Sequence, residues 1–359
     1  MVLQPSVEYR LLRTTEELSS FVPAWRRLWE RDQQAMPFQS PEWLLPWWRQ
    51  FGNDELSAVV IERKGEAIGF LPFYVYRAST KRQGQLLPLG VGTTDYLDGV
   101  FAPECLIEQI RGSIEELRGS VKHDVFCATQ LSEHSRLLEA MRGAESRGQG
   151  SVSSDRAASI SQSEGCSRMA AVMMAELPQK IRRNAMYYRN RAQRCGRLEL
   201  VQAVESNWEE FFEELRRLHA LRWQTRGEGG VLADECVVRW HCEAMPLLLR
   251  AGLLRLMALK LDDQVIAVLY SLIDPARERR TQYFYITAYS PEHADLRPGT
   301  LLIAYAVERA AQEGVAIIDM LRGDEGYKQI WHMEKVPTFS VTLRAATRAA
   351  EHGEEENAA

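Results

Sequence analysis

The sequence has no long apolar segment, no recognisable cysteine pattern and no excess of positive charge. No apolar run approaches the ~20 residues that a membrane-spanning helix needs. The first residues carry no basic region followed by an apolar stretch, which is unlike a secretory signal. The net charge of -5 and the sequence pI of about 5.9 exclude a general basic field that would attract nucleic acid. We therefore expect a cytoplasmic protein without a membrane span.

The six cysteines show no CxxC pair and no regular spacing. This spacing favours reduced thiols over a zinc site or a disulfide framework. His219, His241 and Cys242 lie in expected helices and lack metal-ligand spacing to any neighbour, so we expect no metal.

The overall composition is that of an ordinary folded protein. The chain has 359 residues, of which 45% are hydrophobic and 26% are charged. At roughly 100–200 residues per domain, this length favours two domains. Large apolar residues nearly vanish over 142–166, which marks the expected boundary. We expect an N-terminal lobe over 1–150, a flexible connection over 151–170, a C-terminal lobe over 171–348 and a disordered acidic tail over 349–359.

In the first half, hydrophobic spacing predicts two helices followed by a hairpin. Apolar residues at three-and-four spacing predict a helix over 15–33, and Ser40-Pro41 is typical of the start of a second. Tryptophans at helical spacing are expected in the core. The alternating pattern over 57–73 predicts a β-hairpin.

A short segment, Gly92–Val100, lies between two expected strands and combines two glycines with two aspartates. This composition suits a functional loop and also a plain turn. Both interpretations stay open at this point.

The second half begins with a basic helix expected over 178–195. Seven lysine and arginine side chains occur from Lys180 to Arg197 with no acid between them. They form either a solvated face that balances acids elsewhere or an anion-binding face for a phosphorylated ligand or RNA. Like charges at this density repel one another, so a nearby acid would stabilise the helix.

Beyond this helix, the pattern predicts an ordered series of elements. Helices are expected over 208–226 and 234–250, and an antiparallel hairpin over 253–273. A third strand, a helix opened by a Pro-Gly pair and a fourth strand over 315–320 follow. This order indicates an α+β fold with a mixed sheet rather than a continuous βαβ winding.

Two segments combine residues that suit a functional site. In Asp295–Thr300, the glycine lets backbone approach a ligand, and the free amides at the helix start can bind an anion. In Asp319–Trp331, an acid at a strand end precedes a charged, glycine-bearing loop and then a Tyr-Lys pair. Polar loops placed at strand ends often carry function.

Together, these features resemble a known family. The order is a tryptophan-rich helix, Thr-Asp-Tyr-Leu-Asp, a basic helix, Leu-Arg-Trp, a Pro-Gly helix start and Asp-x-x-Arg-Gly-Asp-Glu-x-Tyr-Lys-x-x-Trp. From about Val7 to Leu343, the chain resembles GNAT-superfamily acyltransferases of the CelD-like (cellulose biosynthesis protein D-like) branch, which are related to FemAB aminoacyl transferases. The closing motif is the most specific part of the resemblance.

The resemblance implies an α+β fold of two GNAT-like lobes, each a mixed, mostly antiparallel sheet flanked by helices. It implies transfer of an acyl group from acyl-CoA (acetyl-CoA or longer), as co-substrate, to an amine or hydroxyl of a small molecule or saccharide. Direct attack by the acceptor is favoured, because the sequence has no nucleophile with a paired base such as GxSxG.

The resemblance also implies site residues in three groups. The catalytic candidates are Tyr327, which would protonate the leaving thiolate, Asp319 and Asp324 for the acceptor, and Lys328 for a phosphate or an oxyanion. The pyrophosphate loop falls on Arg297, Pro298, Gly299, Thr300 and Leu301, without the second glycine of the usual pattern. The substrate-binding candidates are Asp95, Tyr96, Asp98, Arg222, Trp223, Arg322 and Trp331.

Two alternative functions stay open. An aminoacyl-tRNA-dependent, FemAB-like transferase would bind tRNA through the basic helix at 180–197. A non-catalytic GNAT-fold protein in polysaccharide biosynthesis would agree with the missing second glycine, whereas the intact segment Arg322–Lys328 favours an enzyme.

Overall fold

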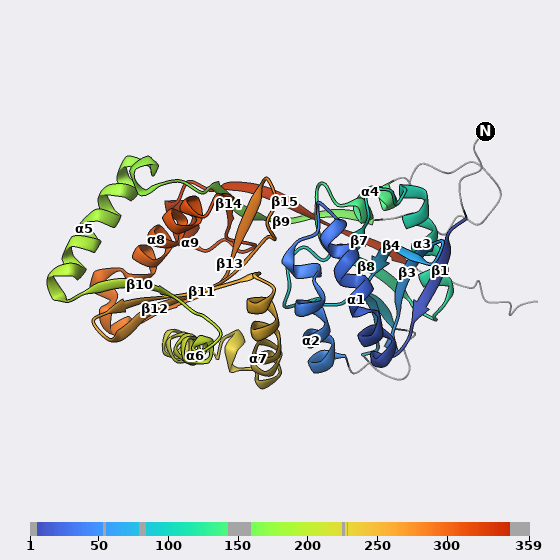
Figure 1. Ribbon diagram of the computed structural model, residues 1–359, viewed down its shortest axis with the longest axis horizontal. Helices are drawn as coiled ribbons and strands as arrows, with labels where there is room; N and C mark the ends of the chain where they lie inside the picture. Colours follow the sequence, from blue (N-terminus) through green and yellow to red (C-terminus); the bar gives the residue numbers. More distant parts are fainter. Residues whose placement is uncertain are drawn as a thin grey trace, which may run out of the picture.

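The computed structural model describes residues 6–52, 55–78, 84–142, 159–224, 227 and 229–344. Two lobes lie next to each other along the longest axis of the molecule (Figure 1). Each lobe combines sheet strands with flanking helices, which confirms the expected α+β class. In the described part of the chain, no helix has the length and apolar character to cross a membrane.

The N-terminal lobe holds the elements from β1 to α4, most of which are labelled in Figure 1. They are β1 (Glu8–Leu12), α1 (Thr15–Arg31), α2 (Pro41–Phe51), β2 (Glu55–Leu56), β3 (Ala58–Arg63), β4 (Glu66–Leu71), β5 (Phe73–Tyr76), β6 (Gln85–Pro88), β7 (Val100–Phe101), α3 (Ile107–Gly119), β8 (Val125–Ser132) and α4 (Arg136–Arg142), with a 3-10 turn at Pro37–Gln39. The two expected helices and the hairpin of β3 and β4 are confirmed.

Local chemistry explains why α1 begins where it does. The hydroxyl of Thr14 accepts a hydrogen bond from the Glu17 amide at 3.2 Å, and the Glu17 carboxylate accepts one from the Thr14 amide at 3.1 Å. This reciprocal pair is a capping box, which satisfies amides that the helix itself leaves free. The stripe of buried side chains that follows, from Leu18 to Trp29, packs α1 against the small sheet.

The C-terminal lobe holds the remaining helices and the strands β10 to β14. Its elements are α5 (Gln179–Cys195), β10 (Leu198–Gln202), α6 (Trp208–Gln224), α7 (Glu235–Arg250), β11 (Leu254–Leu261), β12 (Gln264–Ile273), β13 (Arg280–Tyr289), α8 (Pro298–Gln312), β14 (Val315–Asp319) and α9 (Gly326–Ile330). Strands β10 to β13 form an antiparallel series, and β13 pairs with β14 in parallel. Helix α8 makes the crossover between these two parallel strands, as a parallel pair requires.

Two long strands, β9 (Ser159–Ala170) and β15 (Glu334–Arg344), connect the lobes. β9 pairs with β14 at one end and with β15 along its length, and β15 pairs with β8 of the N-terminal lobe. One sheet therefore runs through both lobes in the order β10-β11-β12-β13-β14-β9-β15-β8-β6-β5-β2, and a smaller sheet has the order β1-β3-β4-β7. The crossing strands lie at the centre of Figure 1.

The expectation of a flexible connection is wrong for 159–170, which form β9. This stretch has the composition of a linker, yet it is held because strands pair with it on both sides. Residues 151–158 of the expected connection, residues 143–150 at the end of the expected N-terminal lobe, and the tail at 349–359 lie outside the described residues.

Aromatic side chains fill the boundary between the lobes. Trp43 of α2 packs edge-on against Trp240 of α7, with ring centroids 4.6 Å apart, and against Tyr285 of β13 at 5.3 Å. The Trp240 indole also donates a hydrogen bond to the Trp43 carbonyl at 3.2 Å. These tryptophans lie in the core, as their helical spacing predicts.

We expect Trp43→Ala to lower the free energy of unfolding by about 3–5 kcal/mol, because it removes a large buried side chain and leaves a cavity between the lobes. Denaturant unfolding would measure this loss. The control is Tyr76→Ala, which removes an aromatic ring that is 43% exposed on β5 and should cost less than about 1 kcal/mol. Similar losses for both variants would contradict a stabilising aromatic boundary.

Candidate active site

The parallel strands β13 and β14 separate at the centre of the C-terminal lobe. Their pairing ends where Tyr283 lies opposite Asp319. Beyond this point β13 continues to Tyr289, whereas β14 gives way to the loop that leads into α9. The two strands therefore diverge towards the start of α8, and the expected site segments lie on either side of this divergence.

The start of α8 presents main-chain amides without bulky side chains. Arg297, the residue before the helix, has a left-handed backbone with φ of 50°, and its side chain is exposed. Gly299 and Thr300 follow Pro298 in the first turn, where helix amides have no partner within the helix. Such amides, with the positive end of the helix dipole, favour an anionic group.

Gly299 leaves space where a side chain would interfere. A Cβ atom at this position would lie 3.1 Å from Cδ1 of Tyr289. The guanidinium of Arg222, from α6, lies 5.7 Å from the centre of the same tyrosine ring. Arg222 and Gly299, both expected from the sequence, thus lie beside Tyr289, the last residue of β13.

Tyr327 lies near this opening, at the start of α9. Burial raises the pKa of its phenol to about 12, Glu325 raises it further, and Arg222 acts in the opposite direction. Its hydroxyl therefore stays protonated near neutral pH. That state is the one a proton donor to a leaving thiolate requires.

A loop of the N-terminal lobe covers the point where the strands separate. The Tyr285 hydroxyl of β13 donates to the Thr93 carbonyl at 2.7 Å. Arg322, just after β14, donates to the Thr94 carbonyl at 3.3 Å and lies 3.0 Å from the Asp95 carboxylate. Burial raises the pKa of Asp95 to about 6, and the Arg322 guanidinium opposes this shift. The expected residues Asp95 and Arg322 are thus brought together across the lobes.

Three side chains from distant segments meet beneath this loop. The Tyr96 hydroxyl donates to Asp319 Oδ2 at 2.6 Å, and Arg168 Nε donates to the same oxygen at 2.7 Å. Arg168 Nη2 donates to the Tyr96 hydroxyl at 2.7 Å, while Asp319 Oδ1 accepts from the Leu321 amide at 2.7 Å. Asp319 has 0% exposure.

Because both Asp319 oxygens already accept hydrogen bonds, the geometry does not support its expected role as a base for the acceptor. Burial alone would lower the pKa of Arg168, but the Asp319 carboxylate outweighs it and the net shift is upward. Arg168 therefore stays charged beside Asp319. The pair holds Tyr96 in place at the divergence of the strands.

The expected role of Lys328 as a ligand for a phosphate or an oxyanion is contradicted by its contacts. Its ammonium donates to the carbonyls of Leu321, Arg322 and Gly323 at 3.2, 2.7 and 3.2 Å, and lies 2.8 Å from the Glu325 carboxylate. Lys328 is only 3% exposed. An ammonium can donate three hydrogen bonds, and the contacts within the loop account for all three.

Other expected residues lie away from the divergence or inside the core. Asp324 is exposed and pairs with Lys335 at 2.9 Å. Trp331 has 2% exposure and packs in the core of the C-terminal lobe, which contradicts its expected contact with substrate. Leu301 is buried in the same core. Trp223 packs beside His219, with ring centroids 5.8 Å apart.

Sequence reasoning missed Arg168. The residue follows a serine-rich stretch expected as a connection, so no periodic pattern marked it as part of a strand. Only the pairing of β9 with β14 places Arg168 opposite Asp319.

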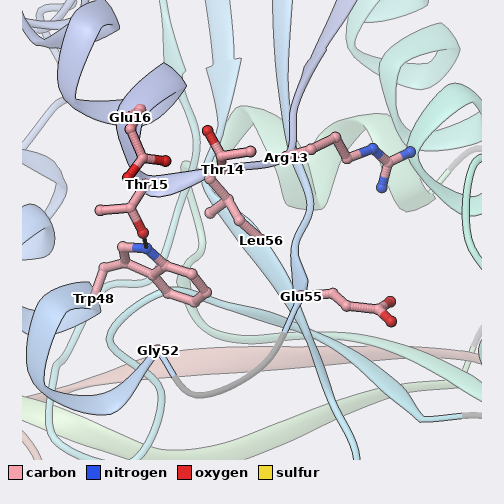
Figure 2. Close-up of a pocket in the computed structure, with 8 residues that line it drawn as sticks. All are labelled: Arg13, Thr14, Thr15, Glu16, Trp48, Gly52, Glu55 and Leu56. Carbon is pink, nitrogen blue, oxygen red and sulfur yellow. Dashed lines mark hydrogen bonds between the residues drawn. The ribbon is translucent and has the colours of Figure 1, made fainter.

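A pocket of about 420 Å³ lies in the N-terminal lobe, beside the start of α1 (Figure 2). The Trp48 indole donates to the Thr15 hydroxyl at 2.9 Å, and the Arg13 guanidinium donates to the Ser57 hydroxyl at 2.9 Å. Figure 2 shows Arg13 and Glu55 pointing away from Trp48. The polar groups of this pocket thus stabilise the local fold. The candidate site lies instead where β13 and β14 diverge.

No group of three or more His, Cys, Asp or Glu side chains that could hold a metal ion occurs within the described ranges.

Residues 179–329 match the family model described as the acetyltransferase (GNAT) domain. The C-terminal lobe has the GNAT acyltransferase fold. The matched range extends from α5 to α9 and so includes the divergent strands and the start of α8. No curated protein matches the chain.

Solved structures share the fold over nearly the whole chain. A conserved protein of unknown function from Bacteroides thetaiotaomicron is 12% identical, with a TM-score of 0.59 over 94% of this chain and 100% of that one. FemX is 11% identical, with a TM-score of 0.58 over 94% and 97%. The C-terminal domain (DUF2156) of a putative lysylphosphatidylglycerol synthetase from Agrobacterium fabrum is 11% identical, with a TM-score of 0.57 over 91% and 93%. These likenesses concern the fold.

We expect Arg168→Met to lower the free energy of unfolding by about 3–5 kcal/mol, because it leaves Asp319 buried without a guanidinium beside it. Arg10→Met is the matched control, since it breaks an ion pair to Glu62 in which the arginine is 46% exposed, and should cost less than about 1 kcal/mol. Chemical denaturation of both variants measures these two losses in the free energy of unfolding. Equal losses would show that the buried network does not stabilise the protein.

Proposed function

We propose that the protein transfers an acyl group from acyl-CoA to an amine or a hydroxyl by direct attack of the acceptor. The observation that carries this proposal is the divergence of β13 and β14 in front of α8, within the segment that matches the acetyltransferase domain. The proposal covers both N-acyl and O-acyl transfer. It also includes the assignment of the protein to the CelD-like branch.

The residues present fit the anionic end of coenzyme A. Gly299 and Thr300 offer amides in the first turn of α8, and Arg297 adds an exposed guanidinium at the same point. Main-chain amides at a helix start bind phosphate groups, and a nearby arginine adds charge. The single glycine keeps this turn free of a side chain that would lie 3.1 Å from Cδ1 of Tyr289.

The protein's part in acyl transfer is positioning and proton movement. Tyr327, protonated near neutral pH, would give a proton to the leaving sulfur. The thiol nearest to the buried network is an unsuitable nucleophile, since burial raises the pKa of Cys166 to about 12. Direct attack by the acceptor needs no covalent intermediate on the protein.

We expect acetyl-CoA to bind saturably to the wild-type protein, with a dissociation constant in the micromolar range, in isothermal titration calorimetry. Gly299→Val should weaken binding at least about 10-fold, because its side chain would crowd Tyr289 and shield the free amides. Gly119→Val, at a glycine with open space around it in the other lobe, should leave binding within about 2-fold. Absence of binding to the folded protein would refute a CoA-dependent function.

A specific observation favours an aminoacyl-tRNA donor as the second candidate. Helix α5 exposes Lys180, Arg183, Arg189, Arg191 and Arg194, and lies at the far end of the C-terminal lobe (Figure 1). Asp295 supplies one neighbouring acid, 2.6 Å from Arg191. On the same helix, Tyr187 is 60% exposed. Cations combined with an exposed aromatic ring suit phosphates and unpaired bases.

If tRNA is the donor carrier, neutralising Arg189, Arg191 and Arg194 by glutamine should weaken tRNA binding at least about 10-fold and reduce its dependence on salt. Fluorescence anisotropy with labelled tRNA at two salt concentrations measures both effects. The same number of changes at Arg10, Arg31 and Arg49 of the N-terminal lobe should change binding less than about 3-fold. Equal losses in both triple variants would show that α5 is no specific RNA surface.

A further inference from the structure

The aspartates between the lobes have partners within the protein. A cavity of about 430 Å³ lies there, with Asp32 and Asp98 on its N-terminal wall and Asp274 on its C-terminal wall. Asp32 and Asp98 accept hydrogen bonds from main-chain amides, and the Arg277 guanidinium lies 3.5 Å from the Asp274 carboxylate. Charges that lack such partners occur instead on the surface, along α5.

Helix α5 presents a stripe of cations to solvent. Lys180, Arg183, Tyr187 and Arg194 follow one another at spacings of three, four and seven residues, which places them on one side of a helix. All four are exposed, whereas the opposite side of the helix is buried against the C-terminal lobe. In the part of the chain that the structure describes, none of the three cations pairs with a carboxylate. Their charge is therefore available to a partner.

Two other arginines of α5 hold the helix against its neighbours. The Arg189 guanidinium lies 5.8 Å from the centre of the Tyr305 ring of α8. Arg191 lies 2.6 Å from the carboxylate of Asp295, two residues before Arg297. These contacts place α5 beside the start of α8, which is the proposed donor site. A partner that binds the outer stripe would therefore lie near that site.

Exposed apolar side chains gather in the same region. Of the eight large apolar side chains that are exposed in the described ranges, three occur in α5 or shortly before it: Met173, Met186 and Tyr187. Met186 is 51% exposed and lies three residues after Arg183, next to the stripe of cations. Apolar side chains that gather on a surface mark a site of interaction. The partner should therefore offer both anionic and apolar groups.

A membrane surface meets this requirement better than RNA does. Both carry phosphates for the cations, and Tyr187 suits either a base or the level of the lipid headgroups. Met173 and Met186 gain little from RNA, whereas flexible apolar side chains gain by entering the boundary between headgroups and acyl chains. In Figure 1, α5 lies at the end of the molecule farthest from the N-terminal lobe, with no labelled element beyond it. A broad surface can therefore approach the helix.

We propose that α5 docks the protein on the surface of a membrane that contains anionic lipid. Lys180, Arg183 and Arg194 contact the lipid phosphates, and Met186 and Tyr187 enter the headgroup region beside them. Each cation near such a surface strengthens binding about 5-fold. The net charge of the chain is -5, so the attraction is local to α5 and orients the protein with this helix towards the lipid. The inference goes beyond the proposed acyl transfer and does not depend on it.

The first test is flotation of the full chain with vesicles of phosphatidylglycerol and phosphatidylcholine in equal parts, compared with phosphatidylcholine alone. The wild-type protein should bind the anionic vesicles at least about 10-fold more tightly, and added salt should weaken this binding. A triple variant should weaken it at least about 10-fold: Lys180→Gln, Arg183→Gln and Arg194→Gln. The matched control, which should change binding less than about 3-fold, removes three exposed cations elsewhere: Arg27→Gln, Lys122→Gln and Arg250→Gln.

A second variant separates a membrane from RNA. Met173→Ser combined with Met186→Ser keeps every charge and the Tyr187 ring, so it should leave any binding of tRNA unchanged. Vesicle binding should weaken at least about 3-fold, because two apolar side chains no longer enter the lipid. Tyr76→Ser combined with Leu106→Ser removes exposed apolar side chains from the N-terminal lobe and should change vesicle binding less than about 2-fold. Far-UV circular dichroism checks that all variants fold.

A measurement on the wild-type protein needs no variant. A photoactivatable phosphatidylglycerol in the vesicles should form adducts within residues 173–197, located by mass spectrometry, and adducts confined to other segments would overturn the inference. So would equal binding of the two kinds of vesicle, equal losses in both triple variants, or vesicle binding that the methionine changes leave intact. Binding of tRNA without binding of vesicles overturns it as well and favours the second candidate function. Acetyl-CoA binding tests the proposed acyl transfer separately, so failure of one hypothesis leaves the other standing.

Discussion

The arrangement of the whole molecule depends on one buried carboxylate. Asp319 ends β14 with no exposure to solvent, and it accepts hydrogen bonds from Arg168 of β9 and Tyr96 of the N-terminal lobe. Burying a charge is costly unless its partners stay in place, and removing one partner leaves the rest destabilised. The lobes are therefore fixed to each other at the point where the strands diverge. A reaction at that point needs such positioning more than it needs a reactive side chain.

The two lobes differ in what they can bind. In the C-terminal lobe, Gly299 opens the first turn of α8 to a ligand. In the N-terminal lobe, the segment before α3 contains no glycine, and Arg136 donates to its carbonyls at Ala102 and Cys105. Glu104 in that segment would repel an anionic ligand. The proposed donor site therefore lies in the C-terminal lobe, and the N-terminal lobe contributes the covering loop and a cavity wall.

The sequence predicts most of the local structure but not the connection between the lobes. Apolar periodicity locates α1, α6 and α7, and alternation locates the hairpins, because these patterns depend on neighbours within one element. β9 carries a polar, serine-rich sequence, and it becomes a strand because β14 and β15 pair with it. Its role depends on residues about 150 positions away, which no local pattern records. Lys328 is the opposite case. Its motif can be recognised in the sequence, but its hydrogen bonds to loop carbonyls cannot.

The candidate site was predictable where a motif marks it and not where charges meet across the fold. The resemblance names Gly299 and Tyr327, whereas Asp32 and Asp274 have no motif and face the same cavity from different lobes. Main-chain amides donate to both carboxylates, and the Arg277 guanidinium also lies 3.5 Å from Asp274. A buried acid is ordinarily stabilised by a nearby cation. Asp274 has such a cation beside it, whereas Asp32 accepts from the Gln34 and Phe101 amides, so the electrostatics of this cavity depend on contacts that no motif records.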